Sequence, residues 1–239
     1  MTSLWLISFS LLGAVVTSPA AAATLSGTVQ LKDSREPKVK KNREASGVVL
    51  WLTAKETPSV KASPLKAQIL QRNKRFEPHV LPIYTGGIVT FPNLDPIFHN
   101  AFSNYDGKVF DLGLYPPGQT RSVRFDRPGV VRLFCNIHAT MSAIIVVVNT
   151  PYFGSSQAGG RWEIKDVPPG DYLLSIFHER STAEVLKALE RPVRLPGAGV
   201  ELSPILISES GYETKPHANK HGMPYPPIDA NPVYPGAKR

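Results

Sequence analysis

Hydrophobic and polar positions alternate along much of the chain with a period of two residues, the pattern of β-strands that bury one face. The alternation is clear at 25–31, 47–52 and 161–176. In the last segment large apolar residues stand at alternate positions on both sides of a Pro-Pro-Gly turn, namely Trp162, Ile164, Tyr172, Leu174 and Ile176. The pattern predicts paired strands joined by a tight turn.

A second set of strands is predicted between these segments. Their expected limits are 68–76, 80–84, 88–91, 109–115, 121–125, 130–134 and 142–149. The last of them contains the apolar run Ile144 to Val148. The order is all β, and a Greek-key sandwich is the natural way for such a set to close.

Candidate chemistry is concentrated around Cys135, the single cysteine of the chain. His138 and Met141 follow it within one short loop between two predicted strands, and His99 stands upstream. Two His, one Cys and a distant Met form the donor set of a trigonal copper site with a weak axial sulfur. Alternatives are a buried free thiol, a catalytic Cys-His pair, and, for Met141 alone, packing in the core. A thiol nucleophile would not need the methionine, and no oxyanion motif is present.

These motifs resemble those of the cupredoxins, the small blue-copper proteins. The resemblance rests on Phe91-Pro92-Asn93, on His99-Asn100, and on the segment 125–135 with its C-x2-H-x2-M continuation, a ligand loop of the length found in amicyanin. Leu133 replaces an aromatic residue of many relatives, and no Pro stands within the loop. The resemblance implies one type 1 copper ion per chain.

The cupredoxin resemblance also implies a role for each motif residue. His99, Cys135 and His138 would be the equatorial ligands, and Met141 the axial one. Asn100 would donate its backbone N–H to the Cys sulfur and help to set the reduction potential. Asn93 would brace the two ligand loops.

The remaining strands resemble a different family, the carboxypeptidase regulatory-like, transthyretin-type β-sandwich. Residues 27–52 are similar to its first half and 158–176 to its second, with about 100 residues between them. Residues 24–64 alone are too few to bury a core. We therefore expect a cupredoxin domain inserted into a second sandwich, with limits of 1–23 for a signal peptide, 24–64 plus 151–208 for the outer sandwich, 65–150 for the insert and 209–239 for a flexible tail.

The first 23 residues are predicted to direct export. A short apolar run ends in Ala20-Ala21-Ala22-Ala23, which is typical of a secretory signal with a cleavage site near Ala23. The run is shorter than the roughly 20 apolar residues that a membrane span needs, and no later stretch reaches that length. A lone cysteine in an exported chain calls for an explanation, and a metal site provides one. We expect a periplasmic or otherwise exported protein without a transmembrane segment.

The formal net charge of +8 suggests a class of partner. The basic run 38–43 is explained by a solvated surface, but the overall charge favours an acidic redox protein or peripheral contact with an anionic membrane. Nucleic acid is not expected as a partner, because the chain is exported and has no recognition motif.

The other histidines are assigned smaller roles. His79 is expected to be structural, and His178 is expected either to face solvent or to lie between the two domains near the metal loop. His217, His221 and Met223 stand in a Pro-rich tail that is predicted to be disordered. There they could hold a loosely bound metal ion.

The predicted function is that of a one-electron carrier, without chemistry on a substrate and therefore not an enzyme. The alternatives are a copper chaperone or sensor that uses the same ligands, and a structural envelope module with an empty site. The overall plan also resembles proteins labelled methylamine utilization protein, which implies electron transfer near amine dehydrogenases.

Overall fold

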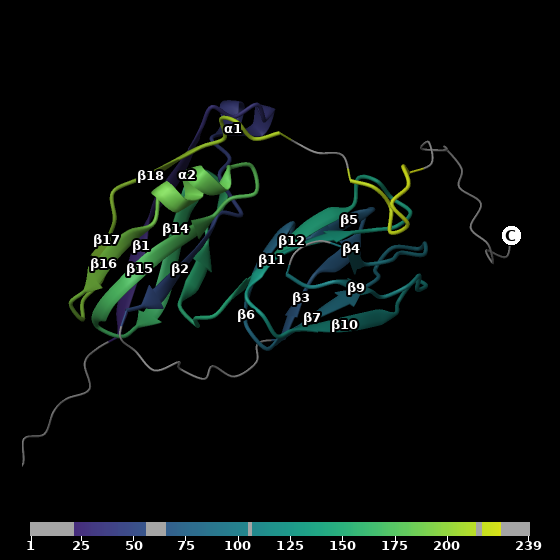
Figure 1. Ribbon diagram of the computed structural model, residues 1–239, viewed down its shortest axis with the longest axis horizontal. Helices are drawn as coiled ribbons and strands as arrows, with labels where there is room; N and C mark the ends of the chain where they lie inside the picture. The colour runs from purple at the N-terminus through teal and green to yellow at the C-terminus, as the bar shows by residue number, and fades with distance from the viewer. Residues whose placement is uncertain (1–21, 56–65, 105–106, 214–216, 226–239) are drawn as a thin grey trace, which may run out of the picture.

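The computed structural model describes residues 22–55, 66–104, 107–213 and 217–225. Strands dominate these residues and confirm the predicted all-β class. They form two groups that lie side by side in Figure 1. Residues 1–21 of the predicted signal peptide lie outside the described residues.

The first group consists of two sheets. One has the order β14 (Arg161–Val167), β1 (Ala23–Lys32), β17 (Val200–Glu201), with β18 (Ile205–Ser208) also paired to β1. The other has the order β13 (Phe153–Ser155), β2 (Val49–Ala54), β15 (Gly170–Phe177), β16 (Arg191–Leu195). Strands from both ends of the described chain therefore share these sheets, while the exact domain limits stay a prediction.

The core of the first group follows the predicted alternation. Alternate positions of β1 are buried, and Leu174 of β15 is fully buried. Trp162 is only 3% exposed. Its ring leaves no room over Gly27, where an added Cβ would lie 2.9 Å from a ring carbon. Gly27 is therefore required by the packing of Trp162 against β1.

The second group also has two sheets and a small hairpin. One sheet has the order β10 (Thr120–Phe125), β7 (Gly87–Pro92), β3 (Lys66–Gln68). The other has the order β6 (Val80–Tyr84), β12 (Ser142–Val148), β11 (Gly129–Phe134), β8 (Phe102–Ser103), β9 (Phe110–Asp111). The hairpin pairs β4 (Leu70–Arg72) with β5 (Arg75–Glu77). The core between them includes Phe91, Phe125 and Leu133, and it also contains Cys135 and Met141.

β12 joins the two groups, because both of its faces are buried. Ala143, Ile145 and Val147 lie in the core of the second group. The alternate residues Ile144, Val146 and Val148 pack in a separate cluster with Val49 and Phe177 of the first group. The continuous apolar run of this strand is explained by this two-sided burial.

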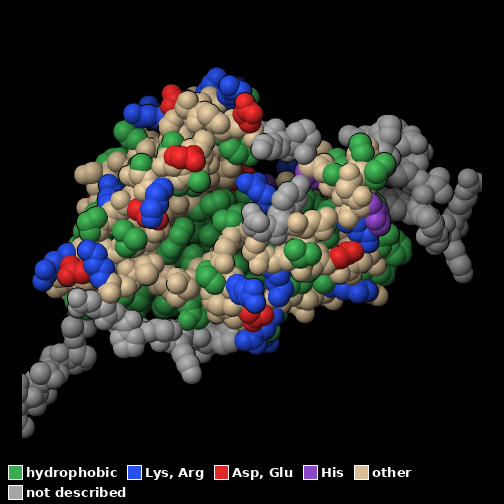
Figure 2. Space-filling view, in the orientation of Figure 1, with side chains coloured by type: hydrophobic (Ala, Val, Ile, Leu, Met, Phe, Trp, Pro, Cys, Tyr) green, Lys and Arg blue, Asp and Glu red, His purple; other side chains and the backbone are tan. Residues whose placement is uncertain are grey.

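Helices are short and were not predicted. They are α1 (Pro37–Asn42), α2 (Ala183–Ala188) and the 3₁₀ turn η1 (Ala158–Gly160). The hydroxyl of Thr182 caps α2 by accepting the N–H of Val185. Among the described residues, no helix has the length and hydrophobicity to cross a bilayer. Figure 2 shows Lys and Arg side chains over both halves of the visible face, with no single basic patch.

Three predicted segments differ in the structure. Of the strand expected at 109–115, only β9 (Phe110–Asp111) is formed. The strand expected at 68–76 is broken at Asn73 and Lys74, which both adopt positive φ angles, of 55° and 53°. Their N–H groups donate to the carboxylate of Asp95, which stabilises the turn. In the tail that was predicted to be flexible, residues 217–225 form hydrogen bonds with the second group of strands. Composition alone did not reveal these tertiary contacts.

Candidate metal centre

Three of the predicted ligand residues lie together at one end of the second group. One ligand atom from each of His99, Cys135 and His138 lies within 4.8 Å of the others. The Cys135 Sγ is 3.6 Å from Nδ1 of His138 and 4.0 Å from Nδ1 of His99. A thiol sulfur and two imidazole nitrogens are therefore directed at a common point.

The loop from Cys135 to Met141 is closed by its own backbone. It begins directly after β11 and ends directly before β12. The N–H of Cys135 donates to the carbonyl of Met141 at 3.1 Å, and the N–H of Met141 donates to the carbonyl of His138 at 3.0 Å. This tight reversal turns His138 toward Cys135. Met141 is fully buried in the same core cluster as Cys135.

The pKa values of both histidines at the centre favour the neutral imidazole. Burial lowers the pKa of His138 to about 4, helped by the charges of His99 and Lys74. Burial also lowers the pKa of His99, although Asp95 opposes it. Neutral imidazoles are the form that binds metal. Burial raises the pKa of the Cys135 thiol, against the lowering effect of the backbone N–H groups of Ile137, Asn100 and His138. A fully buried thiol of raised pKa is a poor nucleophile.

Asp95 orients the first histidine. Its Oδ2 lies 2.7 Å from Nε2 of His99, and both side chains are almost entirely buried. Because a carboxylate only accepts, Nε2 of His99 carries the proton, and Nδ1 faces the Cys135 sulfur with its lone pair. Burial raises the pKa of Asp95, but hydrogen bonds from Lys74, His99 and Asn73 outweigh this, and the net pKa is lowered. Sequence reasoning missed Asp95, although its position four residues before His99 was a signal.

The two asparagines act around the loops in different ways. Asn93 donates to the carbonyls of Ile97 and Tyr115 and accepts the N–H of Asp95, so its hydrogen bonds shape the loop that carries His99. Asn100 connects the two ligand loops, because its Oδ1 accepts the N–H of Asn136 at 3.2 Å. Its backbone N–H also acts to lower the pKa of the Cys135 thiol, and its role in setting the reduction potential stays a prediction.

The tail histidines lie outside the cluster. His217 stacks on the ring of Phe134, with centroids 4.0 Å apart, and its Nε2 donates to the carbonyl of Ala139. His221 is exposed and Met223 is 61% exposed. The structure therefore does not bring His217, His221 and Met223 into the group formed by His99, Cys135 and His138.

The remaining histidines lie between the two groups of strands. Nε2 of His79 is 2.7 Å from Glu179, and its Nδ1 is 3.0 Å from the carbonyl of Ser142. His178 is 2% exposed and bonds to Glu209, which also binds Arg180. The solvent-facing position considered for His178 is therefore wrong, because Glu209 compensates for its burial.

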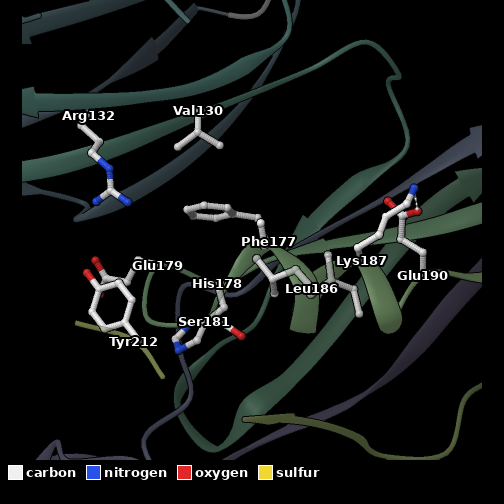
Figure 3. Close-up of a pocket in the computed structure, with 12 residues that line it drawn as sticks. Val130, Arg132, Phe177, His178, Glu179, Ser181, Leu186, Lys187, Glu190 and Tyr212 are labelled. Atoms are coloured by element: carbon white, nitrogen blue, oxygen red, sulfur yellow. Dashed lines mark hydrogen bonds and ion pairs between the residues drawn. The ribbon is translucent and has the colours of Figure 1, made fainter. Parts of the chain in front are cut away.

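A cavity of about 500 Å³ opens beside these residues. Figure 3 shows Phe177 near its centre, Arg132 and Glu179 toward one end, and the Lys187–Glu190 pair toward the other. Arg132 belongs to β11, the strand that leads to Cys135. The cavity therefore lies between the two groups, with β11 as one wall.

Comparison with known proteins gives partial structural matches. No protein-family profile matches the chain, and no curated protein matches it. A copper-containing nitrite reductase from Thermus scotoductus matches 39% of this chain at 27% identity and a TM-score of 0.34, and the chain spans only 25% of its length. A purple cupredoxin from Nitrosopumilus maritimus matches 34% at 26% identity and a TM-score of 0.32, over 99% of its own length. A mutant amicyanin in its reduced Cu(I) form matches 41% at 16% identity and a TM-score of 0.33, over 98% of its length.

Proposed function

We propose that the chain is an exported copper protein of cupredoxin type that carries single electrons between redox partners. The observation that carries the proposal is the convergence of the Cys135 sulfur and the two Nδ1 atoms of His99 and His138 within 4.8 Å. Met141 is the axial ligand in this proposal, by the resemblance described above. A copper ion in this donor set supplies a one-electron couple.

The donor set favours copper over the other common metals of such sites. A buried thiolate with two neutral imidazoles also suits zinc, so these residues alone do not distinguish the two metals. As the axial ligand that the resemblance implies, Met141 favours copper, because a thioether is a soft ligand that copper accepts and that structural zinc sites do not use. The carboxylate of Asp95 fixes the His99 ring, as at many metal sites.

The surrounding residues are suited to a carrier. Asn100 and Asn136 connect the two ligand loops, and the closed backbone of 135–141 limits movement of the ligands. Little movement means a small cost of reorganisation when an electron arrives or leaves. His138 is the least buried of the three residues, so its ring edge is the route by which the electron leaves.

The burial of the site also argues against easy metal exchange. Cys135 and His99 have no exposed surface, whereas His221 and Met223 lie at the surface away from them. A chaperone or sensor would need more open ligands. An acidic redox partner is proposed from the net charge of +8. Export and the methylamine utilization label stay predictions from the sequence.

The test is an optical and EPR titration of the purified protein with Cu(II), beside Cys135→Ser. We expect an intense visible thiolate-to-copper band that the substitution abolishes. The matched control is His221→Ala, an exposed tail histidine whose removal should leave the band unchanged. A wild-type spectrum without this band would contradict the proposal.

A further inference from the structure

Residues 217–225 lie along the loop that carries Cys135 and His138. Three of them bond directly to loop residues. Nε2 of His217 donates to the carbonyl of Ala139 at 2.9 Å, the N–H of Lys220 donates to Oδ1 of Asn136 at 2.9 Å, and the hydroxyl of Tyr225 donates to the carbonyl of Cys135 at 2.9 Å. We call residues 217–225 the strap.

Lys220 also ties the strap to the other ligand loop. Its Nζ lies 2.7 Å from Oδ2 of Asp111, and Oδ1 of Asp111 accepts from Asn100 at 2.7 Å. Asn100 in turn accepts the N–H of Asn136. Lys220, Asp111, Asn100 and Asn136 therefore form a closed ring of hydrogen bonds. The residues that precede Asn100 and Asn136 in the chain are His99 and Cys135.

Aromatic packing holds the strap in place. The His217 ring stacks on Phe134, the last residue of β11, with an interplanar angle of 29°. The Tyr225 ring meets the His217 ring edge-on, with centroids 5.1 Å apart. Phe134 is itself only 6% exposed. The strap thus covers the strand end from which the Cys135 loop begins.

We propose that the strap is a positioning element that holds the Cys135–Met141 loop closed, with His217, Lys220 and Tyr225 as its positioning residues. The backbone of Cys135 is then fixed on both sides, since its N–H bonds to Met141 and its carbonyl to Tyr225. Releasing the strap frees this carbonyl and breaks the ring that joins the two ligand loops. The thiol becomes accessible only when the loop opens. The expected effect on metal retention rests on the proposed function, whereas the expected effect on the reactivity of the Cys135 thiol does not.

The test uses the metal-free protein and measures how fast the Cys135 thiol reacts with Ellman's reagent. Because Cys135 is the only cysteine, the signal has one source. Losing one hydrogen bond that holds the loop should speed the reaction about fivefold, for Tyr225→Phe and for Lys220→Met alike. Combining both with His217→Ala should speed it by at least about tenfold. His221→Ala and Met223→Ala, which alter exposed strap side chains, should leave the rate unchanged.

Circular dichroism and thermal unfolding of each variant separate local opening from loss of the fold. If the triple variant does not fold, Tyr225→Phe and Lys220→Met decide the question, since each removes one polar group. Folded variants that react no faster than the wild type would overturn the inference. In copper-loaded protein the same variants should release the metal to a chelator faster. A protein that binds no copper but shows the predicted thiol rates would refute the proposed function and leave the strap standing.

Discussion

His99 and His79 have the same carboxylate partnership and opposite surroundings. Nε2 of His99 lies 2.7 Å from a carboxylate oxygen of Asp95, and Nε2 of His79 lies 2.7 Å from one of Glu179. The second nitrogen of His99 faces the Cys135 sulfur, whereas that of His79 lies 3.0 Å from the carbonyl of Ser142. A carbonyl accepts a hydrogen bond from an N–H, whereas a metal requires an unprotonated nitrogen with a lone pair, so the second nitrogen distinguishes a candidate ligand from a structural histidine.

Burial explains why their pKa values move in opposite directions. The His99 side chain has no exposed surface, and burial lowers its pKa despite Asp95. The His79 side chain is 48% exposed, and its hydrogen bond to Glu179 raises its pKa above the usual value. A nearby carboxylate is therefore not enough to predict the charge of a histidine.

The largest expected difference comes from removing each ring. His99→Ala should abolish the visible copper band, because it removes one of three strong donors. His79→Ala should leave the band at its wild-type intensity. Titration with Cu(II) followed by absorbance checks both, with thermal unfolding to verify that each variant folds. Equal loss of the band in both folded variants would contradict the distinction.

Substitution of Glu209 tests how much the ionic cluster beside His79 contributes to stability. It accepts hydrogen bonds from Ser34, His178 and Arg180, and its side chain is 4% exposed. Glu209→Ala leaves these groups unpaired and should lower the free energy of unfolding by about 3 kcal/mol, measured by urea denaturation. Glu201→Ala, on the exposed side of β17, should change it by less than about 0.5 kcal/mol. A loss at Glu209 no larger than at Glu201 would show that the cluster is not stabilising.

Asp95→Asn alters the partner of His99 without removing a ligand. An amide can offer its NH₂ to Nε2, which removes the preference for the tautomer with Nδ1 unprotonated. Copper affinity should fall by about 10- to 100-fold while the thiolate band persists. Competition with a chelator measures the affinity. Asp126→Asn, at an exposed ion pair with Arg124, is the control and should bind copper as the wild type does. Unchanged affinity in Asp95→Asn would remove the orienting role of Asp95.

The smallest expected effect is the pH dependence that His79 contributes. The pKa of His79 is raised in the folded protein. Its contribution to stability is therefore fully present below its pKa in the unfolded chain, about 6.5, and is lost as the pH rises through its pKa in the folded protein. Urea denaturation should give a free energy of unfolding that differs between about pH 5.5 and about pH 8.5. His79→Gln should reduce this difference by less than about 1 kcal/mol, because the ring is half exposed. The same pH dependence in both proteins would contradict this assignment.

The sequence predicted what depends on local spacing. The interval from Cys135 to Met141 was enough to place His138 and Met141 in one short loop between two predicted strands. The alternation at Trp162 and Ile164 predicted their shared buried face, and both are buried. These features are determined by neighbours in the chain and by the period of a strand.

Features that depend on contacts between distant segments were not predictable in this way. Asp95 is important because the His99 ring and the turn at Asn73 both meet it. The strap has a composition typical of disorder, yet Tyr225 bonds to Cys135, 90 residues away in the chain. Likewise, Glu209 compensates for the burial of His178 from another strand end. Pairings of this kind require the tertiary structure.

In the function that we propose, Cys135, His99 and His138 bind one copper ion together. X-ray absorption at the copper edge of the Cu(II)-loaded protein tests it most directly, because it reports the atoms that neighbour the metal. We expect one close sulfur and two imidazole nitrogens per copper, with the sulfur absent in Cys135→Ser. A wild-type spectrum with only nitrogen and oxygen neighbours, unchanged in Cys135→Ser, would contradict it.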